Sequence, residues 1–340
     1  MYLCLVAAAF TGSSALVLRE ADADGKQTPA TESAPDCPCV GVEGREGSVM
    51  QPINSSMKLS IVAAEEYGST CKVWDDDNYP GCKDGQTPGK GESWCAMKWC
   101  YVDPCNCNLT TPPVQSYSFA DSQVQGKPLY YSYDTCGGND TWSVENNDES
   151  CVAQTDQNSC EALSKCAYKD SKCVKKELLD TCTSEKDTTV WGNNSCQCVG
   201  ISNRTGFSIA RAGTDGENPV HYPPGVGSWC NAWEQYVDYP GCTGDNPPDW
   251  CSQKWCYVDP CQCNIADDPV ITFSFPDAKY QGKALFYSYS TCGGKDSWTG
   301  SNNDGACVNQ NDQTACDNLA SKCSWTGSKC VGKDIVDACN

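Results

Sequence analysis

The chain has 340 residues and a formal net charge of −20 at pH 7, with 29 cysteines and a single histidine. This acidic balance disfavours nucleic acid and anionic membrane surfaces as partners of the bare protein. The cysteine density is typical of disulfide-rich scaffolds, and the length allows two or three domains.

Residues 1–15 are predicted to be a signal peptide. The stretch MYLCLVAAAFTGSSALVL is apolar, with small residues at Ser13 and Ala15 that fit a cleavage site. An uncleaved membrane anchor is the alternative, but the run is short and contains Thr11, Gly12, Ser13 and Ser14. No other segment is apolar enough to span a bilayer, so we predict a secreted protein without a membrane span after cleavage. Residues 16–36 are polar and contain proline, which predicts a disordered segment.

The string WCYVDPC occurs at Trp99–Cys105 and again at Trp255–Cys261, which is 255 − 99 = 156 positions later. The cysteines after Cys4 form two sets of 14 whose matching members lie 156 to 160 positions apart. This periodicity predicts a tandem duplication, with unit 1 at 37–182, a linker at 183–195 and unit 2 at 196–339. The first set is Cys37, Cys39, Cys71, Cys82, Cys95, Cys100, Cys105, Cys107, Cys136, Cys151, Cys160, Cys166, Cys173 and Cys182. The second set is Cys196, Cys198, Cys230, Cys242, Cys251, Cys256, Cys261, Cys263, Cys292, Cys307, Cys316, Cys323, Cys330 and Cys339.

An even number of cysteines in each set predicts seven disulfides within each unit. A bridge exchanged between the units is the alternative, and the spacing alone does not choose among the pairings. Disulfides stabilise mainly by restricting the unfolded chain, typically by ~2–4 kcal/mol each. Such bridges would compensate for a small apolar core.

The predicted fold is small and disulfide-rich, with mainly β and irregular structure. The first part of each unit, such as Cys37–Cys107, is rich in proline and glycine and predicts loops and short strands. Apolar and polar residues alternate along Ile271–Tyr289, which predicts a β-hairpin turning near Gly282. Glu177–Cys182 and Asp334–Cys339 are expected to form short helical turns at the end of each unit.

Five N-x-Ser/Thr sequons accompany the predicted signal peptide, and together they predict a glycoprotein. The acceptor residues are Asn54, Asn108, Asn139, Asn193 and Asn203.

Two patterns raise the question of a metal site. Cys95-x4-Cys100-x4-Cys105-x-Cys107 is dense enough for zinc or an iron–sulfur cluster, but thiolates oxidise in a secretory compartment and no histidine accompanies them. Asp75-Asp76-Asp77-Asn78 is acidic, yet it lacks the spacing and closing glutamate of an EF-hand loop. We therefore expect a solvated acidic turn there, and no metal or cofactor.

Catalysis has little support in the sequence. His221 is the one candidate for a histidine base, and the first unit has no equivalent. Paired carboxylates, as used in glycoside hydrolysis, leave a secreted hydrolase as a minor alternative. The recurring candidates are Asp103/Asp259, Asp121/Asp277, Asp140/Asp296 and Asp148/Asp304. Because Asp-Pro and Asn-Asn-Asp are typical of turns, we predict that the protein is not an enzyme.

In an extended conformation, Trp99 and Tyr101 of the repeated string share one face, with Cys100 and Val102 on the other. Asp103-Pro104 then turns the chain, which indicates a folding corner. The alternative is a bivalent carbohydrate-binding protein in which these rings stack on sugars. The ligand aromatics of that alternative are Trp99, Tyr101, Trp255 and Tyr257.

The order C-x-C, YPGC, WC-x4-CYVDPC-x-C and TCGG resembles cysteine-rich repeats in predicted secreted proteins of unicellular algae and related protists. The resemblance covers nearly all of the mature chain, and WCYVDPC is its most specific part. It transfers no catalytic residue and implies a component of the cell surface or of an extracellular filament. The combined prediction is a non-enzymatic extracellular structural or adhesive protein that associates with itself or with other extracellular proteins.

Overall fold

The computed structural model of the chain describes residues 33–54, 59–79, 82, 93–109, 111–138, 151, 154–212, 218–237, 239–296, 307 and 309–340. The predicted signal peptide lies outside these residues, as does most of the segment expected to be disordered. The end of that segment differs from the expectation. The Ala34 N–H donates to the Thr135 carbonyl (2.9 Å) and the Cys39 N–H donates to Ser33 Oγ (3.2 Å), so Ser33 and Ala34 have hydrogen-bond partners.

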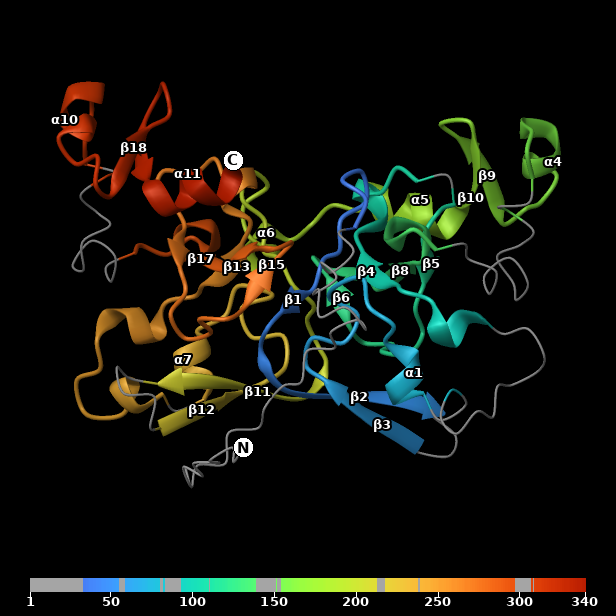
Figure 1. The fold of residues 1–340 in the computed structure, drawn as a ribbon, viewed down its shortest axis with the longest axis horizontal. Coiled ribbons are helices and arrows are strands. Elements are labelled where there is room, and N and C mark those ends of the chain that lie inside the picture. Colours follow the sequence, from blue (N-terminus) through green and yellow to red (C-terminus); the bar gives the residue numbers. More distant parts are fainter. Residues whose placement is uncertain are drawn as a thin grey trace, which may run out of the picture.

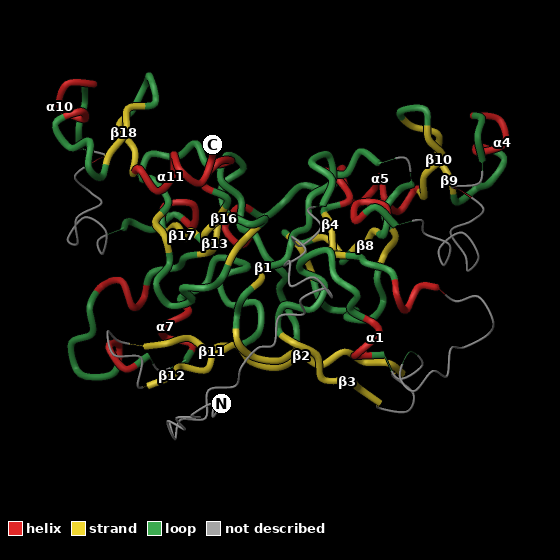
Figure 2. The backbone as a smooth tube through the Cα atoms, in the orientation of Figure 1, coloured by secondary structure: helices red, strands yellow, loops and turns green. Residues whose placement is uncertain are grey.

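Short antiparallel strands and short helices, joined by long loops, make up both halves of the molecule (Figures 1 and 2). We call residues 33–182 the first half and residues 196–340 the second half. The first half contains β1 (Val42–Glu43), β2 (Glu46–Asn54), β3 (Leu59–Ala64), α1 (Asp75–Asn78), η2 (Ser93–Ala96), β4 (Cys100–Val102), η3 (Pro104–Asn106), β5 (Val114–Gln115), β6 (Gln123–Val124), β7 (Lys127–Pro128), β8 (Tyr130–Ser132), η4 (Asp134–Cys136), α4 (Gln157–Glu161), β9 (Cys166–Lys169), β10 (Lys172–Lys175) and α5 (Lys176–Thr183), where η denotes a 3-10 helix.

The expected linker contains a short helix, α6 (Thr188–Trp191), which begins where Asp187 accepts a hydrogen bond from the Thr189 N–H (2.9 Å). The second half contains β11 (Thr205–Ala212), β12 (Asn218–Tyr222), α7 (Trp233–Tyr236), η5 (Pro240–Cys242), η6 (Asp249–Ser252), β13 (Cys256–Val258), η7 (Pro260–Gln262), β14 (Val270–Ile271), β15 (Lys279–Tyr280), β16 (Lys283–Ala284), β17 (Phe286–Ser288), η8 (Ser290–Cys292), α10 (Gln313–Asp317), β18 (Cys323–Trp325), β19 (Cys330–Gly332) and α11 (Lys333–Cys339). The expected helical turns are therefore present as α5 and α11. No described helix has the length and apolar character needed to cross a membrane.

Each cysteine among the described residues forms a disulfide, and each bridge joins two cysteines of the same half. The bridges of the first half are 37–107, 39–100, 71–136, 82–95, 105–182, 151–166 and 160–173. Those of the second half are 196–263, 198–256, 230–292, 242–251, 261–339, 307–323 and 316–330. Matching cysteines thus pair in the same order in both halves. The fold is disulfide-rich, as predicted.

Aromatic rings and cystines fill the interior where aliphatic residues are scarce. The first half packs Tyr67, Trp74, Trp99 and Tyr101 into one cluster, and buried cystines form a second cluster beside it. The second half repeats this division. Large rings bury about 150–250 Å² each, so a few of them supply the apolar area that a chain with little leucine or isoleucine lacks.

A four-stranded antiparallel sheet joins the halves, in the order β12-β11-β2-β3, along the lower side of Figure 1. Its central pairing sets Ser48 opposite Phe207, with Gly47 opposite Ser208 and Val49 opposite Gly206. Phe207 follows Ser48 by 207 − 48 = 159 positions, the same offset that separates Cys39 from Cys198. The pairing is therefore reciprocal about the Ser48–Phe207 pair.

A second set of reciprocal contacts crosses the junction. Strand β1 of the first half pairs with β15 of the second half, with Val42 opposite Tyr280. In the reverse direction, Ser202 of the second half forms an isolated antiparallel β-bridge with Gln123 of the first half. The Gln281 side chain donates to the Cys39 carbonyl (3.3 Å), and the Gln125 side chain donates to the Cys198 carbonyl (3.0 Å). The first half thus adds a strand to the β15–β16 hairpin, and the second half adds an isolated bridge to the β6–β7 hairpin.

The predicted hairpin over Ile271–Tyr289 is only partly correct. Its turn near Gly282 is present, because Gln281 (φ 51°) and Gly282 (φ 74°) adopt the left-handed conformations that link β15 to β16. The long ladder is interrupted, since Pro276 cannot donate to a partner strand and a turn closes from Phe275 to Ala278. Consequently β14 pairs with β17, whereas β15 is free to pair with β1.

Candidate functional site

The repeated string WCYVDPC forms a buried corner around β4 and its counterpart β13. Trp99 and Tyr101 enter the aromatic cluster, whereas Cys100 and Val102 enter the cystine cluster. This is the two-faced arrangement predicted for an extended segment. Strand β4 pairs with β8 (Tyr101 opposite Tyr131), which fixes the corner between the two clusters.

The tryptophan of each corner donates to a buried carboxyl group. Trp99 Nε1 donates to Asp75 Oδ2 (2.8 Å), and the Tyr67 hydroxyl donates to Asp75 Oδ1 (2.9 Å). In the second half, Trp255 Nε1 donates to Glu234 Oε2 (2.8 Å). Burial raises the pKa of both carboxyl groups. Asp75 is only 7 % exposed, so the expectation that this acidic stretch is a solvated turn is wrong at its first residue.

The four aromatic rings of the two strings are core residues. Their exposed fractions are 6 % for Trp99, 1 % for Tyr101, 7 % for Trp255 and 0 % for Tyr257. Gly68 and Gly227 make room for the two tyrosines, because a Cβ at either glycine would collide with the neighbouring ring. A sugar needs an open ring face for stacking. This corrects the suggestion that these four rings are ligand aromatics.

The aspartates of the strings act as turn residues. Asp103 Oδ1 accepts from the Cys105 N–H (3.0 Å) and pairs with Lys127 Nζ (2.5 Å). Asp259 accepts from the Cys261 N–H and pairs with Lys283 Nζ, both at 3.0 Å. Each carboxylate is thus tied to a lysine at the start of a 3-10 helix, as expected for a turn.

The remaining catalytic candidates differ in their exposure. Asp121 and Asp277 are exposed, and Asp296 is partly buried. His221 lies exposed on β12, with its ring centroid 5.7 Å from that of Phe207. Asp140, Asp148 and Asp304 lie outside the described residues.

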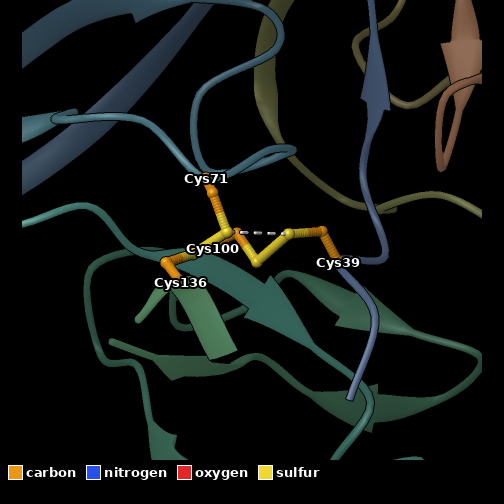
Figure 3. Close-up of side chains that lie close together, drawn as sticks. All are labelled: Cys39, Cys71, Cys100 and Cys136. Carbon is orange, nitrogen blue, oxygen red and sulfur yellow. Dashed lines mark hydrogen bonds between the residues drawn. A yellow bond between two sulfur atoms is a disulfide. The ribbon is translucent and has the colours of Figure 1, made fainter. Parts of the chain in front are cut away.

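Two disulfides lie close together beside each corner, and Figure 3 shows the pair of the first half. Cys39–Cys100 and Cys71–Cys136 approach within 3.9 Å between the sulfurs of Cys39 and Cys71. The matching sulfurs of Cys198 and Cys230 are 3.8 Å apart. Within each group, the four sulfur atoms all lie within 4.8 Å of one another. As thiolates such a group would suit Zn²⁺, but a disulfide sulfur lacks the negative charge that binds the ion.

The cysteine set considered for zinc does not come together. Cys95, Cys100, Cys105 and Cys107 belong to four different bridges, with partners Cys82, Cys39, Cys182 and Cys37 respectively. The four-sulfur group instead draws its members from distant parts of the sequence, because each disulfide closes a loop of about sixty residues. Spacing along the chain therefore could not reveal it.

Three buried charged residues at the junction of the halves carry a network that the sequence analysis missed. Arg45 Nη2 pairs with Glu65 Oε1 (2.6 Å), and Arg45 Nη1 donates to the Val226 carbonyl (3.0 Å). Arg204 donates to the Glu65 and Tyr67 carbonyls, both at 2.9 Å. Burial lowers the pKa of Arg204. A signal was present, since each arginine follows the second cysteine of a C-x-C pair by six positions (45 − 39 and 204 − 198).

Three of the sequon asparagines are exposed. They are Asn108, Asn193 and Asn203, of which Asn193 accepts from the Ser195 N–H (2.9 Å). Asn54 ends β2, and its side chain lies outside the description, as does all of Asn139.

No protein-family model matches the chain, and comparisons with curated proteins and with solved structures find no match. The proposed function therefore rests on the geometry and chemistry of the chain itself.

Proposed function

We propose that this chain is a secreted, non-enzymatic structural or adhesive building block made from two tandem copies of one unit. The observation that carries the proposal is how the repeated residues are used. In both halves the recurring tryptophans and tyrosines of the corner are buried, and its aspartates are held by lysines. The residues that recur serve a rigid scaffold.

The duplication is supported by two correspondences. Matching cysteines form the same seven bridges in each half. The contacts across the junction are also reciprocal, since Arg45 reaches the Val226 carbonyl and Arg204 reaches that of Tyr67, 226 − 67 = 159 positions earlier. A unit copied within one gene would produce both correspondences.

An extracellular location is supported by chemistry and by sequence. Many disulfides fit an oxidising compartment. The apolar leader and the sequons at exposed Asn108, Asn193 and Asn203 fit the secretory route. The proposed relatives are the cysteine-rich repeat proteins of algae and related protists, with a role at the cell surface or in an extracellular filament.

Immunogold electron microscopy of the source cells tests the proposal. We expect label at the cell surface or on extracellular filaments, on protein that carries glycans and begins after Ala15. Label confined to the cytoplasm would contradict the location, and turnover of a polysaccharide by the purified protein would contradict the non-enzymatic role.

One observation favours carbohydrate binding as a second candidate. Tyr117 is 69 % exposed and Phe273 is 78 % exposed, and they occupy matching positions (273 − 117 = 156). Each half thus presents one open ring, which suits bivalent stacking. A glycan array should then show binding that Tyr117→Ala with Phe273→Ala abolishes. Tyr236→Ala is the control, because Tyr236 is 67 % exposed and has no aromatic counterpart.

A further inference from the structure

The sheet shared by the two halves ends in two edge strands of different character. Among the described residues, β3 and β12 are its outermost strands. They are counterparts, because the offset of 159 places Asn218 at the position of Leu59. Strand β12 contains Pro219 and is followed by Pro223, whereas β3 reads LSIVAA, without proline and without charge. Proline and charge are the usual devices that protect an edge from pairing.

Among the residues that the structure describes, no strand pairs with the outer side of β3. Ser60 lies opposite Pro52, which has no N–H, so these two residues do not exchange two hydrogen bonds. The Glu65 N–H donates to the Gly47 carbonyl (3.2 Å). Because hydrogen-bonded residues alternate along an antiparallel pair, the N–H groups of Ala63 and Ile61 also point toward β2. The N–H groups of Ser60 and Val62 therefore point away from the sheet.

An apolar stripe borders this edge on the outer face of the sheet. Val62 is 66 % exposed, and Met50 and Phe207 are each 40 % exposed. Met50 lies opposite Val62, and Phe207 lies opposite Ser48, two residues from Met50, so all three side chains share one face. An edge that is both unpaired and apolar is a template for another strand.

We propose that β3 pairs antiparallel with β3 of a second copy of this chain, which joins two four-stranded sheets into one of eight strands. The contact would extend the sheet in which β2 already pairs antiparallel with β11 across the junction of the two halves. Because Pro219 protects the other edge, the contact closes as a two-fold dimer and does not propagate. The partner of the proposed building block is thus a second copy of the same chain. The biological role of this dimer rests on the proposed function, but the dimer itself can be measured without it.

The test measures the mass of the full secreted protein by analytical ultracentrifugation and light scattering. We expect a mass of two chains for the parent and of one chain for Ser60→Pro, which copies Pro219 onto β3. Val62→Lys should also give one chain without altering the backbone. Phe273→Lys is the matched control, since Phe273 is 78 % exposed but lies outside this sheet, and it should leave the dimer intact.

Opening the second edge provides the converse experiment. Pro219→Ser removes the protection from β12, and we expect species larger than a dimer. Hydrogen exchange should also show a slower Val62 amide in concentrated parent than in dilute parent.

Three results would overturn the proposal. The first is a parent that remains one chain at about 100 µM, where micromolar affinity would be visible. The second is a dimer that survives both Ser60→Pro and Val62→Lys while their near-UV circular dichroism matches the parent. The third is a Val62 amide whose exchange does not depend on concentration, and this result decides the matter even if a variant misfolds. These three results concern only the dimer and do not test the location of the protein. Failure of the proposed contact can therefore be distinguished from failure of the proposed function.

Discussion

Asp75 and Glu234 are carboxyl groups held in the aromatic clusters, and their protonation couples folding to pH. Burial raises the pKa of Asp75 above its ordinary value of 3.8 and that of Glu234 above 4.5. The folded state therefore binds protons more readily than the unfolded chain. Their contribution to the free energy of unfolding is greatest in acid and falls as the pH rises through the raised pKa values.

We predict that the Asp75→Asn, Glu234→Gln double variant flattens this dependence. The free energy of unfolding of the parent, minus that of the variant, should decrease between about pH 4 and pH 7. Guanidinium titrations with intact disulfides would measure it. Asp156→Asn is the control with the opposite sign, because hydrogen bonds from Ser159 lower the pKa of exposed Asp156. A difference that rises with pH in the double variant would contradict the prediction.

The ion pair of Arg45 with Glu65 permits a second prediction at this scale. Arg45→Met should destabilise the protein by about 3–5 kcal/mol, because it leaves the Glu65 carboxylate buried without its partner. Adding Glu65→Met should recover much of that loss, since the uncompensated charge is then gone. Chemical denaturation of the single and double variants is the measurement. If Arg45→Met and the double variant were equally stable, the unpaired charge of Glu65 would not be the cause of the destabilisation.

Strands β2 and β11 meet so closely that only glycine fits at two positions. Gly47 (φ 135°) and Gly206 (φ 136°) lie at matching sites, and a Cβ on them would fall on the carbonyl oxygens of Phe207 and Ser48 respectively. The two glycines therefore decide whether the halves can share one sheet.

We predict that Gly47→Ala and Gly206→Ala each lower the stability by about 2 kcal/mol more than Gly244→Ala, or roughly 4–8 °C in the midpoint. Gly244 has a similar φ of 134° but nothing within 4 Å of its Cβ position, so it carries the backbone strain alone. Differential scanning calorimetry would compare the three variants. Equal midpoints would show that the close approach is not limiting.

Local chemistry made several elements predictable, whereas contacts between distant segments were not. The alternation of side chains in an extended strand predicted the two faces of Trp99–Val102, and the structure confirms them. The Asp-Pro pair predicted the turn at Asp103, which is also present. The sharing of β1 with β15 had no local signal, because the partner lies more than two hundred residues away. The burial of Asp75 was missed for the same reason, since its donors Tyr67 and Trp99 become neighbours only on folding.

At the scale of the whole molecule, the halves are joined by the backbone and by noncovalent contacts. The described disulfides all lie within one half or the other, and the connection between the halves runs through residues 183–195. The shared sheet and the buried arginines supply the rest of the junction.

We predict that cutting the chain at a protease site placed between Glu185 and Lys186 leaves a particle of unchanged native mass. The two fragments should separate on a denaturing gel without reductant, because no described disulfide joins them. Native mass spectrometry and non-reducing electrophoresis would measure both properties. Fragments that migrate together under denaturing conditions would reveal a covalent link between the halves.

The network at the junction has a consequence for how such a molecule can be built. In a homodimer, the rotation axis presents every side chain twice, so a charge placed beside the axis is always doubled. Here two arginines share one acid, since Glu65 pairs with Arg45 and its own carbonyl receives Arg204, while the position that corresponds to Glu65 holds Pro224. Linking both halves in a single chain removes the constraint of identity, so an acid can stand on one side of the junction and a proline at the matching position on the other.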